Sequence, residues 1–220
     1  MSVNRQYFLS FLFPQVLFKA SSIYNGTVTV VEQFGRREVL AGGLQQSGDL
    51  VRELWEAGIK KISNNNQIAT ILILGLGGGS VIPVLQKYYP RAYIVAVEID
   101  PVMVHVAKTY FHIGKRKNLI ILTTDAFQFL KKKTTPRFDL IIVDLFSGDR
   151  ETQGIAGAAF LNSLNGKLSA RGTVIINHLK NRKNAAKLIR YREELKKVFV
   201  TVKEVNPLVN RLYICRKICE

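Results

Sequence analysis

The sequence predicts an α/β fold built on a mostly parallel sheet that is covered by helices on both faces. Three observations predict it. Short apolar runs alternate with helical patterns from residue 71 onward, a glycine-rich turn follows the first run, and the last two strand-like runs have no helix between them. Alternating strands and helices bury both faces of a parallel sheet. Two final strands without a helix indicate an antiparallel hairpin at one edge.

The first strand and its glycine turn predict a nucleotide site. Residues 71–74 form an apolar run, and four glycines follow: Gly75, Gly77, Gly78 and Gly79. Residues 81–89 have helical spacing, and residues 92–97 form a second β-rich run that ends in Glu98, 23 residues beyond Gly75. A Rossmann-like site holds ribose hydroxyls with an acid about 20 residues beyond its glycines. The alternative is a glycine-rich turn without a ligand.

The remaining elements complete the alternation. Asp100 and Pro101 resemble an N-cap followed by proline at the first helical position. The expected helices are residues 102–111, 127–133, 158–168 and 185–199, and the expected strands are residues 119–122, 138–143, 172–177, 202–205 and 212–215. With residues 71–74 and 92–97 these strands make a seven-stranded sheet. The terminal strand pair is typical of the Rossmann-like methyltransferase fold and not of nicotinamide-binding folds.

The first 65 residues predict a small unit that packs on the main domain. Residues 26–44 are rich in β-formers and turn near Gly35–Arg36, and a helix opens at Gly48–Asp49. The polar loop at residues 63–66 gives the expected division into residues 1–65 and residues 66–220. Residues 7–18 are apolar but interrupted by Pro14, so we expect them to dock on the fold or on a partner subunit. Contact with a membrane surface and a cleaved signal are the alternatives.

The net charge and the cysteine content bear on the binding partners and on the cellular compartment of the protein. The 220 residues carry a formal net charge of +16, with a pI of about 10.0. Such a charge favours polyanions, anionic membrane surfaces or acidic substrates, although a generally basic surface explains it equally well. The two cysteines, Cys215 and Cys219, are too few for a disulfide framework or a zinc site. We therefore expect a reducing, cytoplasmic setting and no metal.

Acidic residues follow three of the predicted strands, where the ligands of such sheets bind. Glu98 follows the second strand and is expected to accept from ribose hydroxyls. Asp125 and Ala126 follow the third strand, and Asp125 is expected to accept from an adenine amino group or to cap the next helix. Asp144 follows the fourth strand, either as a site residue or as a solvated loop acid. This set predicts an adenine nucleoside site.

The motifs resemble those of the spermidine synthase family, the polyamine aminopropyltransferases. Six stretches are similar to its motifs: Ser22–Asn25, Gly35–Gln45, Gly75–Ser80, Val97–Pro101, Asp125–Ala126 and Phe138–Asp144. The resemblance implies decarboxylated S-adenosylmethionine as the nucleotide, held by the glycines, Gln45, Glu98, Asp125 and Ala126. It implies that Asp144 helps to deprotonate an amine, with Tyr24 and Asp149 binding the substrate. It also implies a homo-oligomer.

Several acids of the family are absent from this chain. Gly78 replaces the acid that holds the aminopropyl amine, Ala41 replaces another, and Ser147 replaces the second acid after the fourth strand. The nucleoside half of the site is therefore complete, whereas the polyamine half has few acids. We expect S-adenosylmethionine or its decarboxylated form as co-substrate, and aminopropyl or methyl transfer to a small amine.

Two other functions remain open at this point. Basic clusters at residues 115–117, 131–133 and 180–192 could follow the phosphates of a nucleic acid that the protein methylates. A non-catalytic nucleotide-binding protein is the other alternative.

Overall fold

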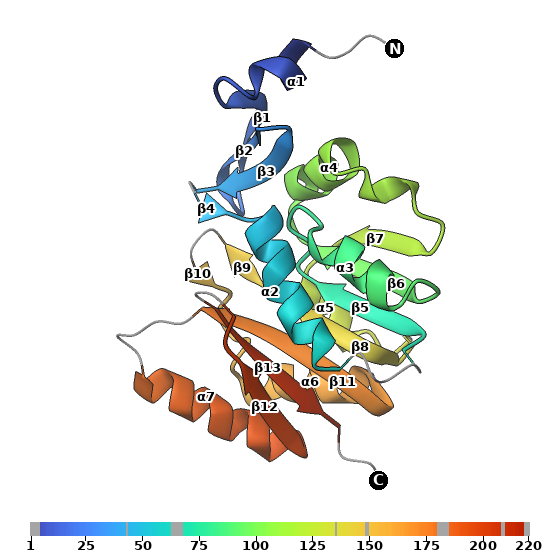
Figure 1. Ribbon diagram of the computed structural model, residues 1–220. Helices are drawn as coiled ribbons and strands as arrows, with labels where there is room; N and C mark the ends of the chain where they lie inside the picture. Colours follow the sequence, from blue (N-terminus) through green and yellow to red (C-terminus); the bar gives the residue numbers. More distant parts are fainter. Residues whose placement is uncertain are drawn as a thin grey trace.

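The computed structural model describes residues 5–42, 44–62, 68–134, 136–147, 150–179, 185–207 and 210–217. Its largest element is a seven-stranded sheet in the order β12-β13-β11-β8-β5-β6-β7 (Figure 1). The strands are β5 (Thr70–Leu74), β6 (Tyr93–Glu98), β7 (Leu119–Thr123), β8 (Phe138–Val143), β11 (Leu168–Leu179), β12 (Thr201–Val205) and β13 (Asn210–Arg216). The first five are parallel to one another, whereas β13 is antiparallel to β11 and to β12. The predicted sheet and its antiparallel edge hairpin are confirmed.

Six of the helices in the described residues cover the two faces of this sheet. One face carries α2 (Asp49–Lys60), α3 (Val81–Tyr88) and α4 (Pro101–Tyr110), and the other carries α5 (Ala126–Lys131), α6 (Ala158–Lys167) and α7 (Ala185–Val198). In β5, Ile71 and Ile73 pack in the core under α2 and α3, while Leu72 and Leu74 pack in the core under α5, α6 and α7. Burial on both faces explains why the strands appear in the sequence as continuous apolar runs.

The order of the strands reverses between β5 and β8. The chain proceeds from β5 outward to β6 and β7, then returns to the other side of β5 to form β8. The ends of these strands are tied together, because the Asp144 N–H donates to the Leu74 carbonyl at 2.8 Å and the Gly75 N–H donates to the Val97 carbonyl at 2.9 Å. Ligands of open α/β sheets bind beyond the carboxyl ends of the strands at such a reversal.

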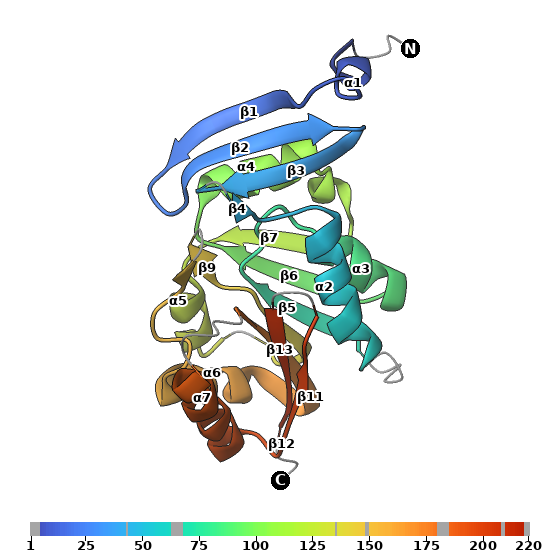
Figure 2. The same cartoon turned by 60° about the vertical axis from the view of Figure 1, so that its left-hand side comes forward.

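A second, four-stranded antiparallel sheet precedes the main sheet (Figure 2). It consists of β1 (Gln15–Ser22), β2 (Gly26–Gln33), β3 (Arg36–Ala41) and β4 (Leu44–Gln45), and α1 (Arg5–Leu9) lies at one end of it. The predicted hairpin is confirmed as β2–β3, although its turn is formed by Phe34 and Gly35, with φ values of 51° and 70°. The sequence did not predict β1, which extends the hairpin to a sheet.

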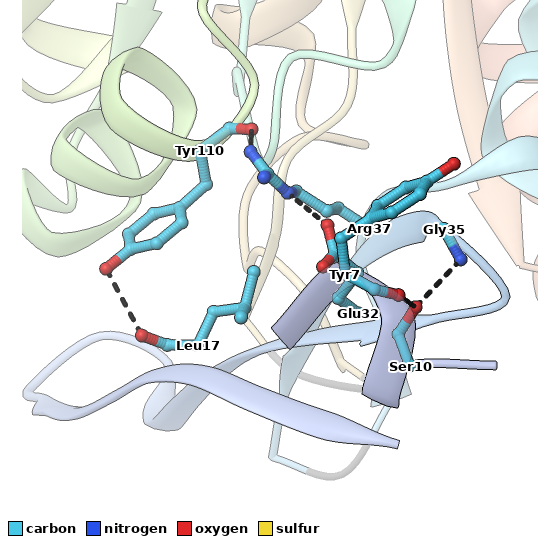
Figure 3. A network of polar contacts seen from close by, with 7 residues as sticks. All are labelled: Tyr7, Ser10, Leu17, Glu32, Gly35, Arg37 and Tyr110. Carbon is cyan, nitrogen blue, oxygen red and sulfur yellow. Dashed lines mark hydrogen bonds and ion pairs between the residues drawn. The ribbon is translucent and has the colours of Figure 1, made fainter. Parts of the chain in front are cut away.

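Hydrogen bonds attach residues 7–10 to this sheet and the sheet to α4 (Figure 3). The Ser10 hydroxyl donates to the Tyr7 carbonyl at 2.7 Å and accepts from the Gly35 N–H at 3.1 Å. Arg37 bridges the Glu32 carboxylate at 2.8 Å and the Tyr110 carbonyl at 3.1 Å. The apolar segment therefore contacts the fold itself, as expected, and its contact with a partner or a membrane stays a prediction.

The helix α2 belongs to the core of the main sheet. Its buried residues Leu54, Trp55 and Ile59 pack in the same cluster as Ile71 and Ile73. The predicted boundary at residues 63–66 lies outside the described residues, so the division at residue 65 stays a prediction.

Three short elements complete the described fold. They are η1 (Ile113–Lys115) and the antiparallel pair of β9 (Phe146–Ser147) and β10 (Arg150–Glu151). Among the described helices none has the length and apolar character needed to cross a membrane.

Candidate active site

A cavity lies at the carboxyl ends of the central strands, between the main sheet and the N-terminal sheet. Its volume is about 200 Å³, whereas a single buried water needs only ~15 Å³. Its wall is formed by Tyr24, Asn25, Gln46, Gly75, Gly77, Val97, Glu98, Ile99, Met103, Thr124, Asp125, Ala126, Phe127, Asp144, Leu145, Phe146 and Thr152.

Most of the residues predicted for the site meet at this cavity. The predicted residues in its wall are Tyr24, Gly75, Gly77, Glu98, Asp125, Ala126 and Asp144. The wall contains Gln46 in place of the predicted Gln45, and it does not include Gly78 or Gly79. Asp149 lies outside the described residues.

Gly75 allows β5 and β8 to approach each other beneath the cavity. Its φ is +87°, a conformation that L side chains rarely adopt, and a Cβ atom there would lie 2.1 Å from the Asp144 carbonyl oxygen. Only glycine fits such a close backbone approach. The first glycine of the turn is therefore needed to bring Asp144 to the cavity.

Glu98 joins the glycine turn to the end of β6. Its Oε2 accepts from the Leu76 N–H at 2.9 Å and the Gly77 N–H at 3.1 Å, and its Oε1 accepts from the Asp100 N–H at 3.0 Å. Burial raises the pKa of Glu98, and these three N–H groups oppose the rise. A carboxylate offers about four acceptor positions, so one further donor from a ligand matches the remaining capacity. Glu98 thus has a structural role that the sequence did not reveal.

Asp125 both caps a helix and faces the cavity. It is the N-cap of α5, and its Oδ1 accepts from the Gln128 N–H at 2.8 Å. Ala126, the first residue of α5, also lines the cavity. The two alternatives for Asp125 are therefore compatible, since its second carboxylate oxygen is not needed for the cap.

Asp144 is a half-buried carboxylate with an altered acidity. Burial raises its pKa to about 6, while donors from Asn177 and Trp55 act in the opposite direction and the negative charge of Glu98 adds to the rise. The Asn177 Nδ2 donates to the Asp144 Oδ1 at 2.8 Å. A strongly shifted acid in a cavity is a candidate for chemistry, and its desolvation distinguishes it from a solvated loop acid.

A buried junction at Asp100 attaches the turn between β1 and β2 beside the cavity. Asp100, which is fully buried, caps α4 by accepting from the Val102 N–H at 2.8 Å. Its other oxygen accepts from the Ser22 hydroxyl at 2.5 Å and the Asn25 amide at 2.7 Å. This junction places Tyr24, which lies between those two residues, in the cavity wall.

The family model of the spermine/spermidine synthase domain matches residues 57–213. The chain belongs to this family. The polyamine aminopropyltransferase of Vibrio vulnificus is 35% identical over 109 residues, which are 49% of this chain and 36% of that protein. The eEF1A lysine and N-terminal methyltransferase homolog of Drosophila melanogaster is 36% identical over 81 residues, which are 36% of this chain and 12% of that protein. The chain thus spans about a third or less of the length of these relatives.

Solved structures agree with the fold. A probable spermidine synthase from Corynebacterium glutamicum has a TM-score of 0.80 at 16% identity, covering 92% of this chain and 80% of that one. Human methyltransferase-like protein 13 in complex with SAH has a TM-score of 0.62 at 22% identity, covering 78% of this chain and 81% of that one. These likenesses show a Rossmann-like methyltransferase fold.

In this spermine/spermidine synthase domain, Gly78 packs closely against residues of the N-terminal unit. A Cβ atom at Gly78 would lie 2.5 Å from the Ser47 Cβ and 3.2 Å from the Val39 Cγ2. Ser47 is fully buried, and its hydroxyl accepts from the Val39 N–H at 3.0 Å. The space that an acid at position 78 needs is therefore filled by Ser47, and position 78 faces the N-terminal sheet.

Sequence reasoning missed four residues of this spermine/spermidine synthase domain that shape its site: Asn25, Gln46, Trp55 and Asn177. Asn25 and Gln46 each adjoin a residue that was predicted, and Trp55 lies on the apolar face of α2. The sequence does contain a signal for Asn177. Alternate residues of a strand face the same side, so Asn177 lies on the same face of β11 as the core residue Ile175, and a polar residue at such a position is unusual.

Proposed function

We propose that this protein transfers an alkyl group from an S-adenosyl sulfonium to an amine. The observation that carries the proposal is the cavity in which Asp144, with its pKa near 6, stands with the glycine turn, Glu98 and Asp125 at the reversal of strand order. The named activities of the two relatives support it, since one concerns polyamines and the other a lysine and an N-terminus, and all of these are amines.

The residues of the wall fit an adenosyl ligand. Glu98 has capacity for a ribose hydroxyl, Asp125 for the adenine amino group, and the turn at Gly75 and Gly77 lets the ligand approach the backbone. When bound, an S-adenosyl sulfonium supplies an electrophilic carbon and its own leaving group. A solved structure with the same fold contains SAH, which supports this class of ligand.

Asp144 would orient the amine and accept its proton. A free alkylammonium has a pKa of about 10.4 and no lone pair with which to attack. The carboxylate attracts the ammonium to the cavity, where burial favours the neutral amine. As the nitrogen–carbon bond forms and the carbon–sulfur bond breaks, the departing proton passes to Asp144 or to water. Positioning of the reactants supplies most of the rate.

Two alkyl groups satisfy the proposal, and each has its own support. The family and the Vibrio vulnificus relative favour an aminopropyl group from the decarboxylated nucleotide. The contact between Gly78 and Ser47 favours a methyl group from S-adenosylmethionine itself, because the acid that holds the aminopropyl amine has no room at position 78.

Calorimetry tests the proposal directly. S-adenosylmethionine, its decarboxylated form and methylthioadenosine are titrated into the wild-type protein, and we expect at least one to bind with micromolar affinity. Glu98→Ala should lose at least tenfold in affinity, while Glu53→Ala, at an exposed position of α2, should retain it. If none of the three nucleotides binds, the proposal is refuted.

The same ligands decide the alkyl group. Tighter binding of the decarboxylated form indicates aminopropyl transfer, and tighter binding of S-adenosylmethionine indicates methyl transfer. Incubation with putrescine or with a lysine-containing peptide, followed by mass spectrometry, then identifies the product and the class of amine.

A further inference from the structure

We propose that Asn177 and Asn210 are positioning residues, which orient the Asp144 carboxylate toward the cavity and keep it ionised through a chain of two hydrogen bonds. The role in catalysis rests on the proposed function, because Asp144 is there the group that meets the amine. The role in orienting and ionising Asp144 can be tested without any substrate.

The chain crosses three neighbouring strands. The Asn177 Nδ2 on β11 donates to the Asp144 Oδ1 at the end of β8 at 2.8 Å, and the Asn210 Nδ2 on β13 donates to the Asn177 Oδ1 at 2.9 Å. The strands β8, β11 and β13 lie side by side in the sheet, and Ile176 of β11 is paired with Val143 of β8. The next pair in that register is Asn177 and Asp144, so the strand alignment itself brings the two side chains together.

Asp144, Asn177 and Asn210 are polar residues at the cavity end of a sheet face that is otherwise apolar. Toward α2, the inner positions of these strands are apolar and belong to one core cluster: Leu140, Ile142, Ile175, Leu212 and Ile214. With the period of two, the next positions toward the cavity are Asp144, Asn177 and Asn210. Asn177 has only 4% of its surface exposed. A buried amide in a core position is costly unless both its donor and its acceptor are used, which is the case here.

The two hydrogen bonds together define which way the Asn177 amide group is rotated. An amide can present either its NH₂ group or its oxygen to a neighbour. The Asn210 NH₂ group faces the Asn177 oxygen, so the Asn177 NH₂ group faces Asp144. A rotated Asn177 amide would place two acceptors together at Asp144 and two donors together at Asn210. Asn210 thus selects the orientation in which Asn177 stabilises a carboxylate, and it adds no charge of its own.

The surroundings of Asp144 show which groups act on its ionisation. From α2, Trp55 donates to it, and from the end of β6, Glu98 is the charged group that acts on it. Burial and Glu98 favour the protonated form, whereas Asn177 and Trp55 favour the ionised form. Loss of the donor from Asn177 therefore leaves the forces that protonate Asp144 less opposed.

The titration of the Asp144 carboxyl carbon, followed by NMR in protein with labelled aspartate, tests the inference. We expect the midpoint to rise by about one pH unit in Asn177→Leu, since a hydrogen bond to a charged group is lost. It should rise by about half a unit in Asn210→Ala, where Asn177 is free to rotate. Asn118→Ala is the control, because this asparagine donates to the Ala92 carbonyl at 2.6 Å, outside the cavity wall, and should leave the midpoint unchanged.

The outcomes separate the inference from the proposed function. A midpoint that stays within about 0.2 units in both Asn177→Leu and Asn210→Ala overturns the inference. If Asn177→Leu does not fold, the test rests on Asn210→Ala, because Asn210 is only half-buried. An unchanged midpoint in Asn210→Ala is then sufficient to overturn the inference. Failure of the wild-type protein to bind any of the three nucleotides refutes the proposed function and leaves the titration result standing. In an active enzyme, both variants should lose kcat while the KM for the nucleotide changes less than about twofold.

Discussion

Replacing Asp144 with asparagine should make the protein more stable at neutral pH. Burial raises the pKa of Asp144 to about 6, above the ordinary aspartate value of 3.8. The folded state therefore binds the proton more tightly than the unfolded state does. The stability that results is fully present below pH 3.8 and is lost as the pH rises through about 6. Asparagine has nearly the same shape and never ionises, so the variant escapes this loss.

The magnitude follows from the difference between the two pKa values. Each pKa unit corresponds to 1.36 kcal/mol, so a rise from 3.8 to about 6 corresponds to about 3 kcal/mol. This figure is an upper value, because Asp144 faces a cavity and is only half-buried. Relative to the wild type, Asp144→Asn should therefore gain up to about 3 kcal/mol of unfolding free energy between about pH 4 and about pH 7.

Urea unfolding at a series of pH values measures this difference by linear extrapolation. Asp139→Asn is the matched control, because Asp139 lies on β8, the strand that Asp144 follows. Burial acts to raise the pKa of Asp139, but hydrogen bonds from Ser169, Ala69 and Thr70 outweigh it and lower the pKa. Its stabilising effect is present at neutral pH and lost in acid, so Asp139→Asn should be less stable than the wild type at pH 7. Parallel pH profiles for the wild type and Asp144→Asn would refute the reasoning.

Three further substitutions test the glycine turn and its acid. Gly75→Ala should lower the unfolding free energy by more than about 3 kcal/mol, because of the positive φ and the close Asp144 carbonyl. Gly166→Ala in α6 is the control: its Cβ would meet no atom within 4 Å, so the unfolding free energy should rise by about 0.5 kcal/mol. Equal changes in the two variants would contradict this account. Gly78→Asp should lower the unfolding free energy, and it should lower it less in a protein that also carries Ser47→Gly. A double-mutant cycle of urea unfolding measures this difference. Additive effects would show that the two residues do not compete for space. Glu98→Ala should lose about 3 kcal/mol of stability together with its nucleotide affinity, since three backbone N–H groups, two of them buried, lose their acceptor. Calorimetric unfolding that matches the wild type would contradict this prediction.

The main sheet could be predicted from the sequence because its signals are local. Apolar runs, helical spacing, the glycines and the Asp100–Pro101 cap each lie within a few residues of the structure they specify. The strand β1 was missed because its burial alternates poorly and its formation depends on pairing with β2. A strand whose existence depends on a partner carries little signal in its own sequence.

In the candidate site too, residues with a local sequence signal were predicted and a residue that depends on strand register was not. Glu98, Asp125 and Asp144 were predicted because each lies at the end of a strand or within two residues of it, and the sheet brings strand ends together. The contribution of Asn177 depends on the register between β8 and β11, two strands joined through α6, and no local pattern states that register. The predicted oligomer, nucleic-acid contact and membrane contact concern other molecules, and they stay predictions.

A buried junction joins the glycine turn at Gly78 to the N-terminal sheet. Ser47 follows the short strand β4, and it enters the glycine turn because its hydroxyl accepts from the Val39 N–H of β3. The Gly48 N–H in turn donates to the Ser80 hydroxyl at 3.1 Å, which closes the same contact from the other side. An acid at position 78 would have to displace this buried junction, and the sheet that carries Tyr24 would move with it. Under the proposed function, this junction would connect the N-terminal sheet to the choice of the alkyl group.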